Sequence, residues 1–264
     1  ETVAMGFLAG HTGQIILRDL LARGVSTNFV WIDGENRTNV ALIVQGREYH
    51  PIHIHEEGPP IPQEAVEIFL RKYDVMLRWA SFVVLAGILA PGLTPNFYRE
   101  LARRAREKGV KVVVHAGGEA LVRTFGERPF LVKPDVREAP KLGDLPVRTK
   151  EEILVAGKEA IAQGVELCLV SYHLTGDILI SKDEVWEFEA RVPLSTFRNL
   201  VCADDALVGG ILVGLTQGMD LIESVRYGMA AAVASAKVDE KLCLDRKQIA
   251  EEMNQIEVRH QRIP

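Results

Sequence analysis

The sequence is poor in cysteine, in basic charge and in long apolar runs, and each shortage excludes a class of protein. Its three cysteines, Cys168, Cys202 and Cys243, are widely spaced and odd in number, so we expect free thiols in a reducing compartment. The 31 Lys and Arg are outnumbered by 36 Asp and Glu, so the basic footprint that nucleic-acid phosphates require is missing. No apolar run reaches the length of a bilayer span, and no charged-then-apolar leader is evident. We expect a cytoplasmic protein without nucleic-acid or membrane partners.

Apolar, strand-like runs alternate with helical segments along most of the chain. The 264 residues are 47% hydrophobic and 25% charged, which is ordinary for a globular protein with one large core and at most a small appended subdomain. We expect strands at residues 3–8, 82–86, 110–114, 130–132 and 165–171, and helices at 14–22, 62–77, 94–108, 119–125, 149–163, 205–217, 221–237 and 245–254. The alternation predicts right-handed βαβ units and a parallel sheet covered on both faces. A hairpin of residues 177–181 and 184–189 is expected at the edge of this sheet.

Residues 28–55 break the alternation. Three short β-rich runs follow one another at 29–32, 39–44 and 48–54. Turn signals at Asp33-Gly34 and Gln45-Gly46 separate these runs and indicate antiparallel hairpins. We interpret the segment as a small sheet beside the main domain, either a lid or an oligomer face.

Three histidines in this segment, His50, His53 and His55, raise the question of a metal site. His53 and His55 fall on one face of a strand, at a spacing that two imidazole ligands could use. No third ligand has the spacing that a zinc site needs. Polar residues of an edge strand are therefore the favoured interpretation.

Two adjacent carboxylates, Asp204 and Asp205, open a long segment of apolar and small residues. Acidic residues commonly begin helices, because their oxygens accept N–H groups and their charge suits the positive end of the helix dipole. Helix capping alone would explain the pair. Alternatively, the helix start presents its N–H groups to a phosphate while one carboxylate acts as a base.

Further polar residues follow the predicted strands, where ligands gather in open α/β sheets. Asp135 and Glu138 are three residues apart, so on a helical turn they would face the same way, as an outer-shell pair for Mg²⁺ would. An acidic helix start explains them as well. Lys133, at a strand end, could reach a phosphate or could simply be solvated.

Several short motifs follow one another in a fixed order. They are Gly6-Phe7-Leu8-Ala9-Gly10-His11-Thr12-Gly13, Gly34-Glu35-Asn36-Arg37-Thr38-Asn39-Val40, Glu57-Gly58-Pro59, residues 85–92, Gly118-Glu119-Ala120-Leu121, Lys133-Pro134-Asp135 and residues 199–210. In this order and spacing they resemble the ribokinase-like sugar kinases, specifically the phosphofructokinase B branch that includes 1-phosphofructokinase and tagatose-6-phosphate kinase. The resemblance covers nearly the whole chain. It implies a three-layer α/β/α sandwich with a mostly parallel central sheet and a small β lid.

By this resemblance, the kinase domain comprises residues 1–27 and 56–264, and the lid comprises residues 28–55. The family's first strand and its Gly-Gly-x-Gly substrate loop are expected to be absent from these residues. The implied activity is ATP-dependent phosphorylation of a sugar phosphate of the fructose 1-phosphate, fructose 6-phosphate or tagatose 6-phosphate type, with Mg²⁺. A homodimer through the lid is also expected, because an exposed small sheet needs cover.

The resemblance also assigns the site residues. Asp205 is the expected catalytic base, and the N–H groups of Cys202, Ala203 and Asp204 are the expected anion hole for the γ-phosphate. The remaining candidates are Arg37, Asn39 and Gly87 for the substrate, Lys133, Ser171 and Gly176 for the nucleotide, and Asp135 and Glu138 for the metal. Catalysis would rest on positioning and charge stabilisation.

The family's Gly-Ala-Gly-Asp motif reads Cys202-Ala203-Asp204-Asp205 in this sequence. Losing both glycines restricts the backbone where it approaches the phosphate. Asp204 adds a negative charge there, and at ~4 Å and an effective dielectric near 20 its repulsion is about 4 kcal/mol, or roughly three decades in rate. Other departures are Ala86 and Ile88 in place of two serines, His55 in place of an asparagine, His115 in place of an aspartate and His173 in place of a glycine. The alternative function is therefore a kinase-fold protein that has lost turnover and binds a sugar phosphate or nucleotide in a regulatory or structural role.

Overall fold

The computed structural model describes residues 1–44, 51–136, 139–239 and 245–262, which fall into two compact units. The first unit consists of Glu1–Val40 and His53–Phe130, and the second of Ala41–Ile52 and Leu131–Pro264. His50, Glu138 and Cys243 lie outside the described residues. Neither Cys168 nor Cys202 forms a disulfide bond within the described residues.

The N-terminal part of the first unit differs from the prediction in its strand pairing. Its elements are β1 (Val3–Ala4), β2 (Phe7–Ala9), α1 (Gly10–Ala22), β3 (Ser26–Thr27) and β4 (Val30–Ile32). The strand predicted over residues 3–8 is two strands, and β1 pairs with β3 while β2 pairs with β4. Both pairs are parallel, so the antiparallel hairpin that we predicted for residues 29–32 is wrong. A parallel partner across a helix is a tertiary choice that turn residues next to the strand do not reveal.

Helix α1 begins at Gly10, four residues before the predicted start, because a distant carboxylate caps it. Glu35 Oε2 accepts a hydrogen bond from the His11 N–H at 3.0 Å, and Glu35 Oε1 accepts one from the Thr12 N–H at 2.5 Å. These two hydrogen bonds lower the pKa of Glu35 below its usual range. Gly10 has φ 59°, and a Cβ there would collide with the Glu35 carboxylate, so glycine is required at this close approach. The glycine-containing stretch Gly10-His11-Thr12-Gly13 is thus the first turn of helix α1.

The rest of the first unit follows the predicted alternation. Its elements are α2 (Gln63–Met76), β7 (Phe82–Ala86), α3 (Asn96–Glu107), β8 (Lys111–Ala116), α4 (Gly118–Val122) and the 3₁₀ turn η1 (Phe125–Glu127). β7 and β8 pair in parallel, with Val84 opposite Val113. The short strands β5 (Val40–Leu42) and β6 (Ile52–Ile54) form a two-stranded sheet within the segment that we interpreted as a lid.

The second unit is a mixed sheet with helices on both faces. Its elements are β9 (Leu131–Pro134), β10 (Lys141–Leu142), β11 (Leu145–Pro146), α5 (Lys150–Ala162), β12 (Cys168–His173), β13 (Gly176–Ile180), β14 (Glu184–Ala190), the 3₁₀ turn η2 (Leu194–Thr196), α6 (Ala203–Thr216), α7 (Leu221–Ala236), α8 (Arg246–Met253) and β15 (Ile256–Arg262). β9 and β12 are parallel, and β13 and β14 form the predicted hairpin, but the prediction that this hairpin is the edge of the sheet is wrong, because β15 lies outside it. β15 was not predicted, and it pairs antiparallel with β14 although we expected the C-terminal third to be mostly helical.

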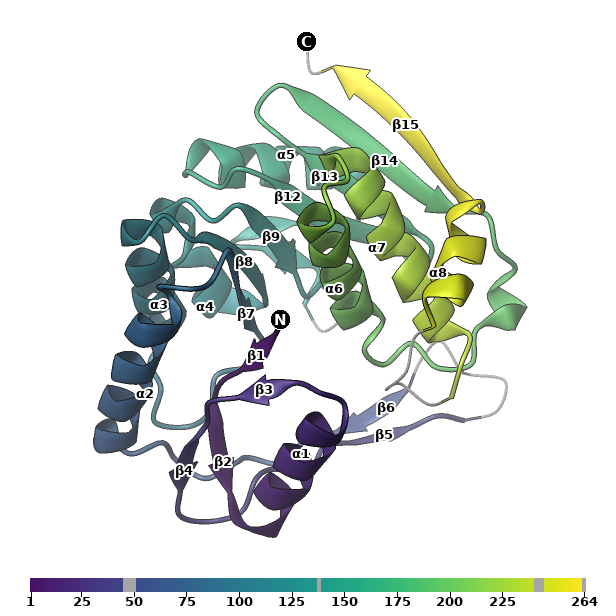
Figure 1. Cartoon of the computed structure of the whole chain (residues 1–264). Coiled ribbons are helices and arrows are strands. Elements are labelled where there is room, and N and C mark those ends of the chain that lie inside the picture. The colour runs from purple at the N-terminus through teal and green to yellow at the C-terminus, as the bar shows by residue number, and fades with distance from the viewer. Residues whose placement is uncertain (45–50, 137–138, 240–244, 263–264) are drawn as a thin grey trace. The chain divides into compact units, whose positions relative to one another are not determined.

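Helices cover both faces of this sheet, as Figure 1 shows. α5 packs on β12 and β13 from one side, and α7, between α6 and α8, covers β14 and β15 from the other. Strand β13 is buried along its whole length, and Ile178, Leu179 and Ile180 are almost inaccessible. The layered α/β architecture that the alternating pattern predicted is therefore confirmed.

Glycines bring the backbones of α6 and α7 into contact. A Cβ added at Gly228 would lie 2.5 Å from the carbonyl oxygen of Leu207, and one added at Gly210 would lie 2.7 Å from Gly228 Cα. No side chain fits between the helices at this crossing. The contact therefore fixes α6 laterally and, with it, the position of its first turn.

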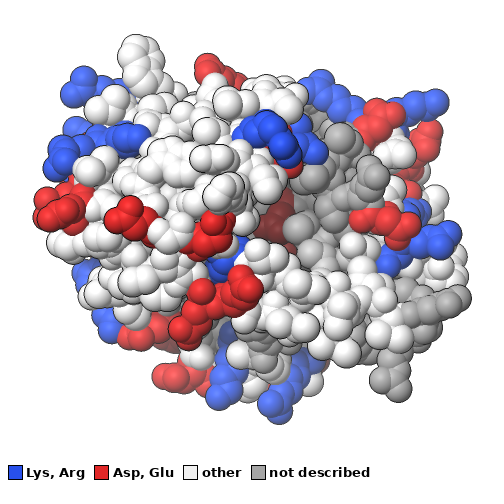
Figure 2. All heavy atoms as spheres, turned by 90° about the horizontal axis from the view of Figure 1, so that it is seen from below, with Lys and Arg blue, Asp and Glu red and all other residues white. Residues whose placement is uncertain are grey.

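Two properties of the described residues bear on partners. None of their helices combines the length and the apolar character that a membrane span needs. On the face drawn in Figure 2, acidic and basic side chains are interspersed around wide uncharged areas, and the described residues there form no continuous basic surface. This distribution agrees with the formal net charge of −5.

The α6–α7 crossing predicts opposite outcomes for two glycine substitutions. We expect Gly228→Ala to lower the free energy of unfolding by about 1–2 kcal/mol, because overpacking of about 1–3 kcal/mol exceeds the gain in helix propensity. Gly209→Ala, on the same helix as Gly210 but with open space around an added Cβ, is the matched control and should be neutral or stabilising. Urea unfolding of both variants tests this. Equal unfolding free energies of Gly228→Ala and Gly209→Ala would contradict the packing argument.

Candidate functional site

Helix α6 begins differently from the other helices of the second unit. Its N-cap residue, Cys202, has φ 61° and ψ 12°, a left-handed conformation that is uncommon for a residue with a side chain. The Cys202 side chain makes no capping hydrogen bond, whereas Thr149, Asp220 and Asp245 cap α5, α7 and α8 with theirs. The start of α6 is thus not closed by its own N-cap side chain.

The two acidic residues of the first turn of α6 have different surroundings. Asp205 is exposed, so its carboxylate is accessible from solvent, while the Asp204 side chain is only 20% exposed. The N–H of Ala203 donates to the carbonyl oxygen of Leu200 at 3.2 Å. One of the N–H groups that we expected in an anion hole therefore has an acceptor within the chain.

A buried lysine joins Asp204 to the sheet. The Lys133 side chain, at the end of β9, is completely inaccessible, and its Nζ lies 3.2 Å from Asp204 Oδ1 and 3.9 Å from Asp177 Oδ1. Lys133 Nζ also donates to Ser171 Oγ at 2.8 Å, and Ser171 Oγ donates to Asp177 Oδ1 at 2.6 Å. We call these four residues the lysine cluster. Removing an ammonium group from water costs several kcal/mol, roughly, unless it is paired and hydrogen-bonded, and here it is both.

Asp177 is the member of this cluster that the sequence analysis did not single out. Burial raises the pKa of Asp177 and the nearby Asp204 carboxylate raises it further, while Lys133 and the hydrogen bond from Ser171 lower it; burial is the largest effect. The available signal was a carboxylate directly before the apolar run Ile178–Ile180, in a strand that the pattern already placed in the sheet. A buried strand rarely carries an unpaired charge, so a partner could have been expected.

The cluster changes the electrostatics expected at the helix start. The predicted repulsion between Asp204 and a phosphate assumed that Asp204 has no counter-ion. The ammonium group of Lys133 is such a counter-ion, and it lies in a site from which water is excluded. Lys133 itself is directed at oxygens of the chain, so its predicted contact with a nucleotide stays a prediction.

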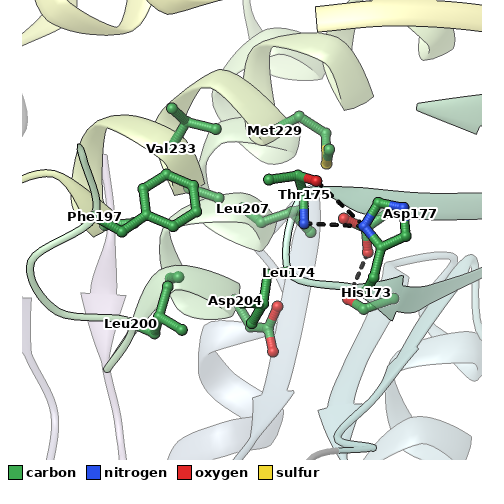
Figure 3. Close-up of a pocket in the computed structure, with 14 residues that line it drawn as sticks. His173, Leu174, Thr175, Asp177, Phe197, Leu200, Asp204, Leu207, Met229 and Val233 are labelled. Atoms are coloured by element: carbon green, nitrogen blue, oxygen red, sulfur yellow. Dashed lines mark hydrogen bonds between the residues drawn. The ribbon is translucent and has the colours of Figure 1, made fainter. Parts of the chain in front are cut away.

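A small pocket lies beside Asp204 (Figure 3). Phe197, Leu200, Leu207, Met229 and Val233 form its apolar part, and the polar groups of Asp204, Asp177, His173 and Thr175 gather on the other side. Ser171, which we expected at the nucleotide, also lines it. The cavity volume is about 60 Å³, which is small beside the roughly 300–1,000 Å³ of whole ligand sites. The pocket can receive one part of a ligand, such as a ring.

The ring of His173 is held in one orientation at the rim of this pocket. The Thr175 N–H donates to His173 Nδ1 at 3.2 Å, and His173 Nε2 lies 3.1 Å from Glu189 Oε2. These two contacts fix the orientation of the ring. Gly176 follows in the same turn, and a Cβ there would lie 2.4 Å or 2.5 Å from the rings of Tyr172 and His173. The glycine is required by crowding.

The substrate candidates Arg37, Asn39 and Gly87 belong to the first unit. The Tyr98 hydroxyl donates to the carbonyl oxygens of Ala86 and Gly87 at 2.6 and 3.1 Å, and Gly87 has φ 88°. Burial raises the pKa of Tyr98 to about 12, and the charge of Arg37 opposes this shift, which places Arg37 close to the same loop.

Asn39 lies in a short network with Glu56. Asn39 Oδ1 accepts a hydrogen bond from the Glu56 N–H at 3.3 Å, and Glu56 Oε2 accepts one from the Thr38 N–H at 2.7 Å. These bonds connect the start of β5 to the segment after β6. They give Asn39 a fixed place without using its amide N–H₂ group.

The metal candidates are only partly described. Asp135 lies just after β9 and is half-buried, whereas Glu138 is outside the described residues. The described residues contain no group of three or more His, Cys, Asp or Glu placed to hold a metal ion. His53 and His55 share a face, with ring centroids 5.7 Å apart, but these two rings alone do not complete a zinc site.

Comparison with known proteins identifies the family. Residues 1–243 match the family described as pfkB family carbohydrate kinase. The chain belongs to this family. It is 31% identical over 237 residues to a 1-phosphofructokinase of Bacillus subtilis (strain 168), covering 90% of this chain and 76% of that protein. It is 29% identical over 235 residues to a 1-phosphofructokinase of Borreliella burgdorferi, covering 89% of this chain and 75% of the relative.

A solved structure supports the same family. A protein of Thermotoga maritima, described as a possible 1-phosphofructokinase, superposes with a TM-score of 0.89 at 29% identity, covering 99% of this chain and 82% of that one. This pfkB family member therefore has the ribokinase-like α/β fold that its motifs implied. In its second unit the structure brings together Lys133, Ser171 and Asp204, three of the residues that we predicted from separate motifs.

The raised pKa of Asp177 predicts how the stability of this pfkB family member depends on pH. A carboxyl group with a raised pKa in the folded state contributes stability below its unfolded pKa of about 3.9 and loses it as pH rises through the folded value. Relative to Asp177→Asn, the wild-type chain should therefore lose unfolding free energy as pH rises above about 4. Urea unfolding of both proteins from pH 4 to pH 8 measures this difference, and Asp183→Asn in the exposed turn before β14 reports the effect of removing a surface carboxylate. If the difference in unfolding free energy between the wild type and Asp177→Asn is constant from pH 4 to pH 8, the raised pKa of Asp177 is contradicted.

Proposed function

We propose that this protein transfers the γ-phosphoryl group of ATP to a hydroxyl group of a sugar phosphate. Its membership of the pfkB family and the names of its 1-phosphofructokinase relatives support this activity. The observation that carries the proposal is the exposed Asp205 in the first turn of α6, a helix start not capped by its N-cap side chain. A helix start of this kind favours anions, and the adjacent carboxylate can accept a proton.

In the proposed reaction, the sugar hydroxyl oxygen attacks the γ-phosphorus, and the bond from that phosphorus to the bridging oxygen of ADP breaks. Asp205 accepts the proton that the hydroxyl group loses. The backbone dipoles of Cys202, Ala203 and Asp204 stabilise the charge on the transferring group. Positioning and preorganised charge are the usual contributions of a protein to phosphoryl transfer.

The pocket beside Asp204 supports a place for the nucleotide. Its apolar side chains suit the face of a purine ring, Ser171 lines the polar side, and Gly176 lies in the chain between the lining residues Thr175 and Asp177. A ring bound there would leave the phosphate chain next to the start of α6. The cavity has room for no more than one ring, so the rest of the nucleotide would lie outside it.

Arg37, Asn39 and Gly87 are the proposed substrate residues. A guanidinium group forms paired hydrogen bonds with phosphate oxygens, which suits Arg37 to the phosphate that the sugar already carries. Asn39 has an amide N–H₂ group that can donate to sugar hydroxyls. Gly87 lets the loop after β7 adopt its positive φ angle near the substrate.

Asp135 and Glu138 are the proposed partners of Mg²⁺. Carboxylate oxygens are the ligands that this ion prefers. Asp135 is half-buried two residues after Lys133, and its carboxylate is therefore a suitable ligand for Mg²⁺. When bound, Mg²⁺ neutralises charge on the nucleotide phosphates. The chain's own contribution, among the described residues, is to hold the Asp135 carboxylate just after β9.

A binding role without turnover is the second candidate. It is favoured by Cys202, whose side chain is exposed where the family has a glycine, and by the Ala203 N–H, which already has an acceptor. Both features reduce what the backbone offers a phosphate. In this role the protein would bind the sugar phosphate or the nucleotide and regulate or scaffold a partner.

Substitution of Asp205 separates these two functions. We expect Asp205→Asn to lower kcat by about 10²–10⁴-fold, the usual contribution of a general base, without loss of stability. The matched control is Asp220→Asn, an Asp to Asn change at the start of α7, where asparagine caps equally well, and it should retain activity. The measurement is a coupled ADP-release assay with fructose 1-phosphate, fructose 6-phosphate and tagatose 6-phosphate. Full activity of the Asp205→Asn variant would exclude Asp205 as the base. Absence of turnover by the wild-type chain, with its nucleotide binding intact, would establish the second candidate.

We also propose that the lid forms a homodimer. Val40, Leu42, Ile52 and Ile54 are between 42% and 55% exposed, and their alternate positions place them on one face of each strand of the β5–β6 sheet. A small apolar sheet face of this kind is normally covered. A second copy of the chain would present the same face to it, which suits a two-fold contact.

The lid proposal predicts a change in oligomeric state. We expect the wild-type chain to be dimeric at micromolar concentration and Leu42→Lys with Ile54→Lys to be monomeric, because two charges would have to be buried at the contact. Light scattering after gel filtration measures this. Ile15→Lys on the exposed face of α1 is the control and should not change the mass. A monomeric wild-type chain would contradict the proposal.

A further inference from the structure

We propose that Lys133 is a positioning residue that cancels the charge of Asp204, so that the start of α6 can accept the transferring phosphoryl group. The inference rests on the proposed kinase function. It concerns a pair that the family's glycine-containing motif would not form, because that motif has a glycine at the position of Asp204.

The first support is the direction of the lysine side chain. Among the described residues, its Nζ lies 2.8 Å from an oxygen of Ser171, 3.2 Å from one of Asp204 and 3.9 Å from one of Asp177. The side chain is 0% exposed. A lysine ammonium group has three donors. Among the described residues, this one donates to Ser171 Oγ and pairs with Asp204 Oδ1, whereas Asp177 Oδ1 lies beyond hydrogen-bond distance. Because this buried ammonium group is paired with Asp204, Lys133 affects the binding of a phosphate by balancing the charge of Asp204.

The second support is the balance of charge within the cluster. Asp204 is the nearer of the two carboxylates to Lys133, while Asp177 is held by the hydroxyl group of Ser171. Burial of Asp177, whose side chain is 8% exposed, raises its pKa and favours its neutral form. The positive charge of Lys133 is then available to Asp204, and the first turn of α6 keeps the attraction for anions that a helix start provides.

Coupling between the two residues distinguishes this role from direct phosphate binding. The probes are ADP and AMP-PNP, a non-hydrolysable ATP analogue that adds the γ-position, and their dissociation constants are measured by calorimetry. We expect Lys133→Met to weaken AMP-PNP binding about tenfold and to affect ADP much less. In the Asp204→Asn background, the same change should weaken AMP-PNP binding less than about threefold, because no carboxylate charge is left to cancel. Lys158→Met, on the exposed face of α5, is the matched control and should leave both constants unchanged.

Three results would overturn the proposal. An equal loss in both backgrounds would indicate direct contact between Lys133 and phosphate. Coupling that appears in the free energy of unfolding but not in AMP-PNP affinity would indicate a purely structural pair. If Lys133→Met does not fold, Asp204→Asn alone decides: because Lys133 already cancels the charge that this change removes, we expect the ratio of AMP-PNP affinity to ADP affinity to stay within about threefold of the wild type, and a rise of tenfold or more would contradict the proposal.

The same experiment separates this proposal from the proposed function. Coupling without turnover on the three sugar phosphates would remove the kinase activity and retain the role of Lys133 in anion binding. Turnover without coupling would remove the role of Lys133 alone. A wild-type chain that binds neither nucleotide would overturn both.

Discussion

A lysine with no access to water, paired with a carboxylate on a neighbouring helix, is the constraint on which the site depends. Lys133 reaches from β9 to Asp204 in the first turn of α6, and Ser171 and Asp177 bind it from β12 and β13. Because an unpaired buried ammonium group is costly, the three strands and the helix start must keep these positions together. α6 also rests on α7 through Gly210 and Gly228, with no room for side chains between them. The charge pairing of Asp204 and the backbone packing of α6 on α7 together locate the start of α6.

This arrangement gives the altered motif a physical explanation. An aspartate in place of a glycine beside a phosphate would repel it, but the buried lysine supplies an opposite charge within 3.2 Å. The other lost glycine has a different consequence, since Cys202 adopts a left-handed backbone conformation that glycine adopts at no steric cost. Membership of the pfkB family, an exposed Asp205 and a nearby apolar pocket together favour phosphoryl transfer at this end of the helix.

Most helices and central strands follow from local pattern, and the differences have tertiary causes. The alternation of apolar runs and helices located β7, β8, β12 and α5 to within a few residues. The start of α1 differed because its cap, Glu35, comes from another part of the chain. Strand β4 pairs with β2 in parallel, although its flanking turn residues indicated a hairpin. Strand β15 was missed because its short alternating run becomes a strand only when the edge of β14 is available to it.

The sequence alone determined the class of fold, the family resemblance and the identity of the acidic pair at the start of α6, because motif order and the period of apolar residues are properties of the chain itself. Only the tertiary structure decided which charges meet. Lys133, Ser171, Asp177 and Asp204 lie on four different elements, and nothing in their spacing along the chain states that one lysine serves two carboxylates. Side-chain burial and counter-ion distance are set by how the elements pack, and at this site they decide whether Asp204 repels a phosphate or is neutralised.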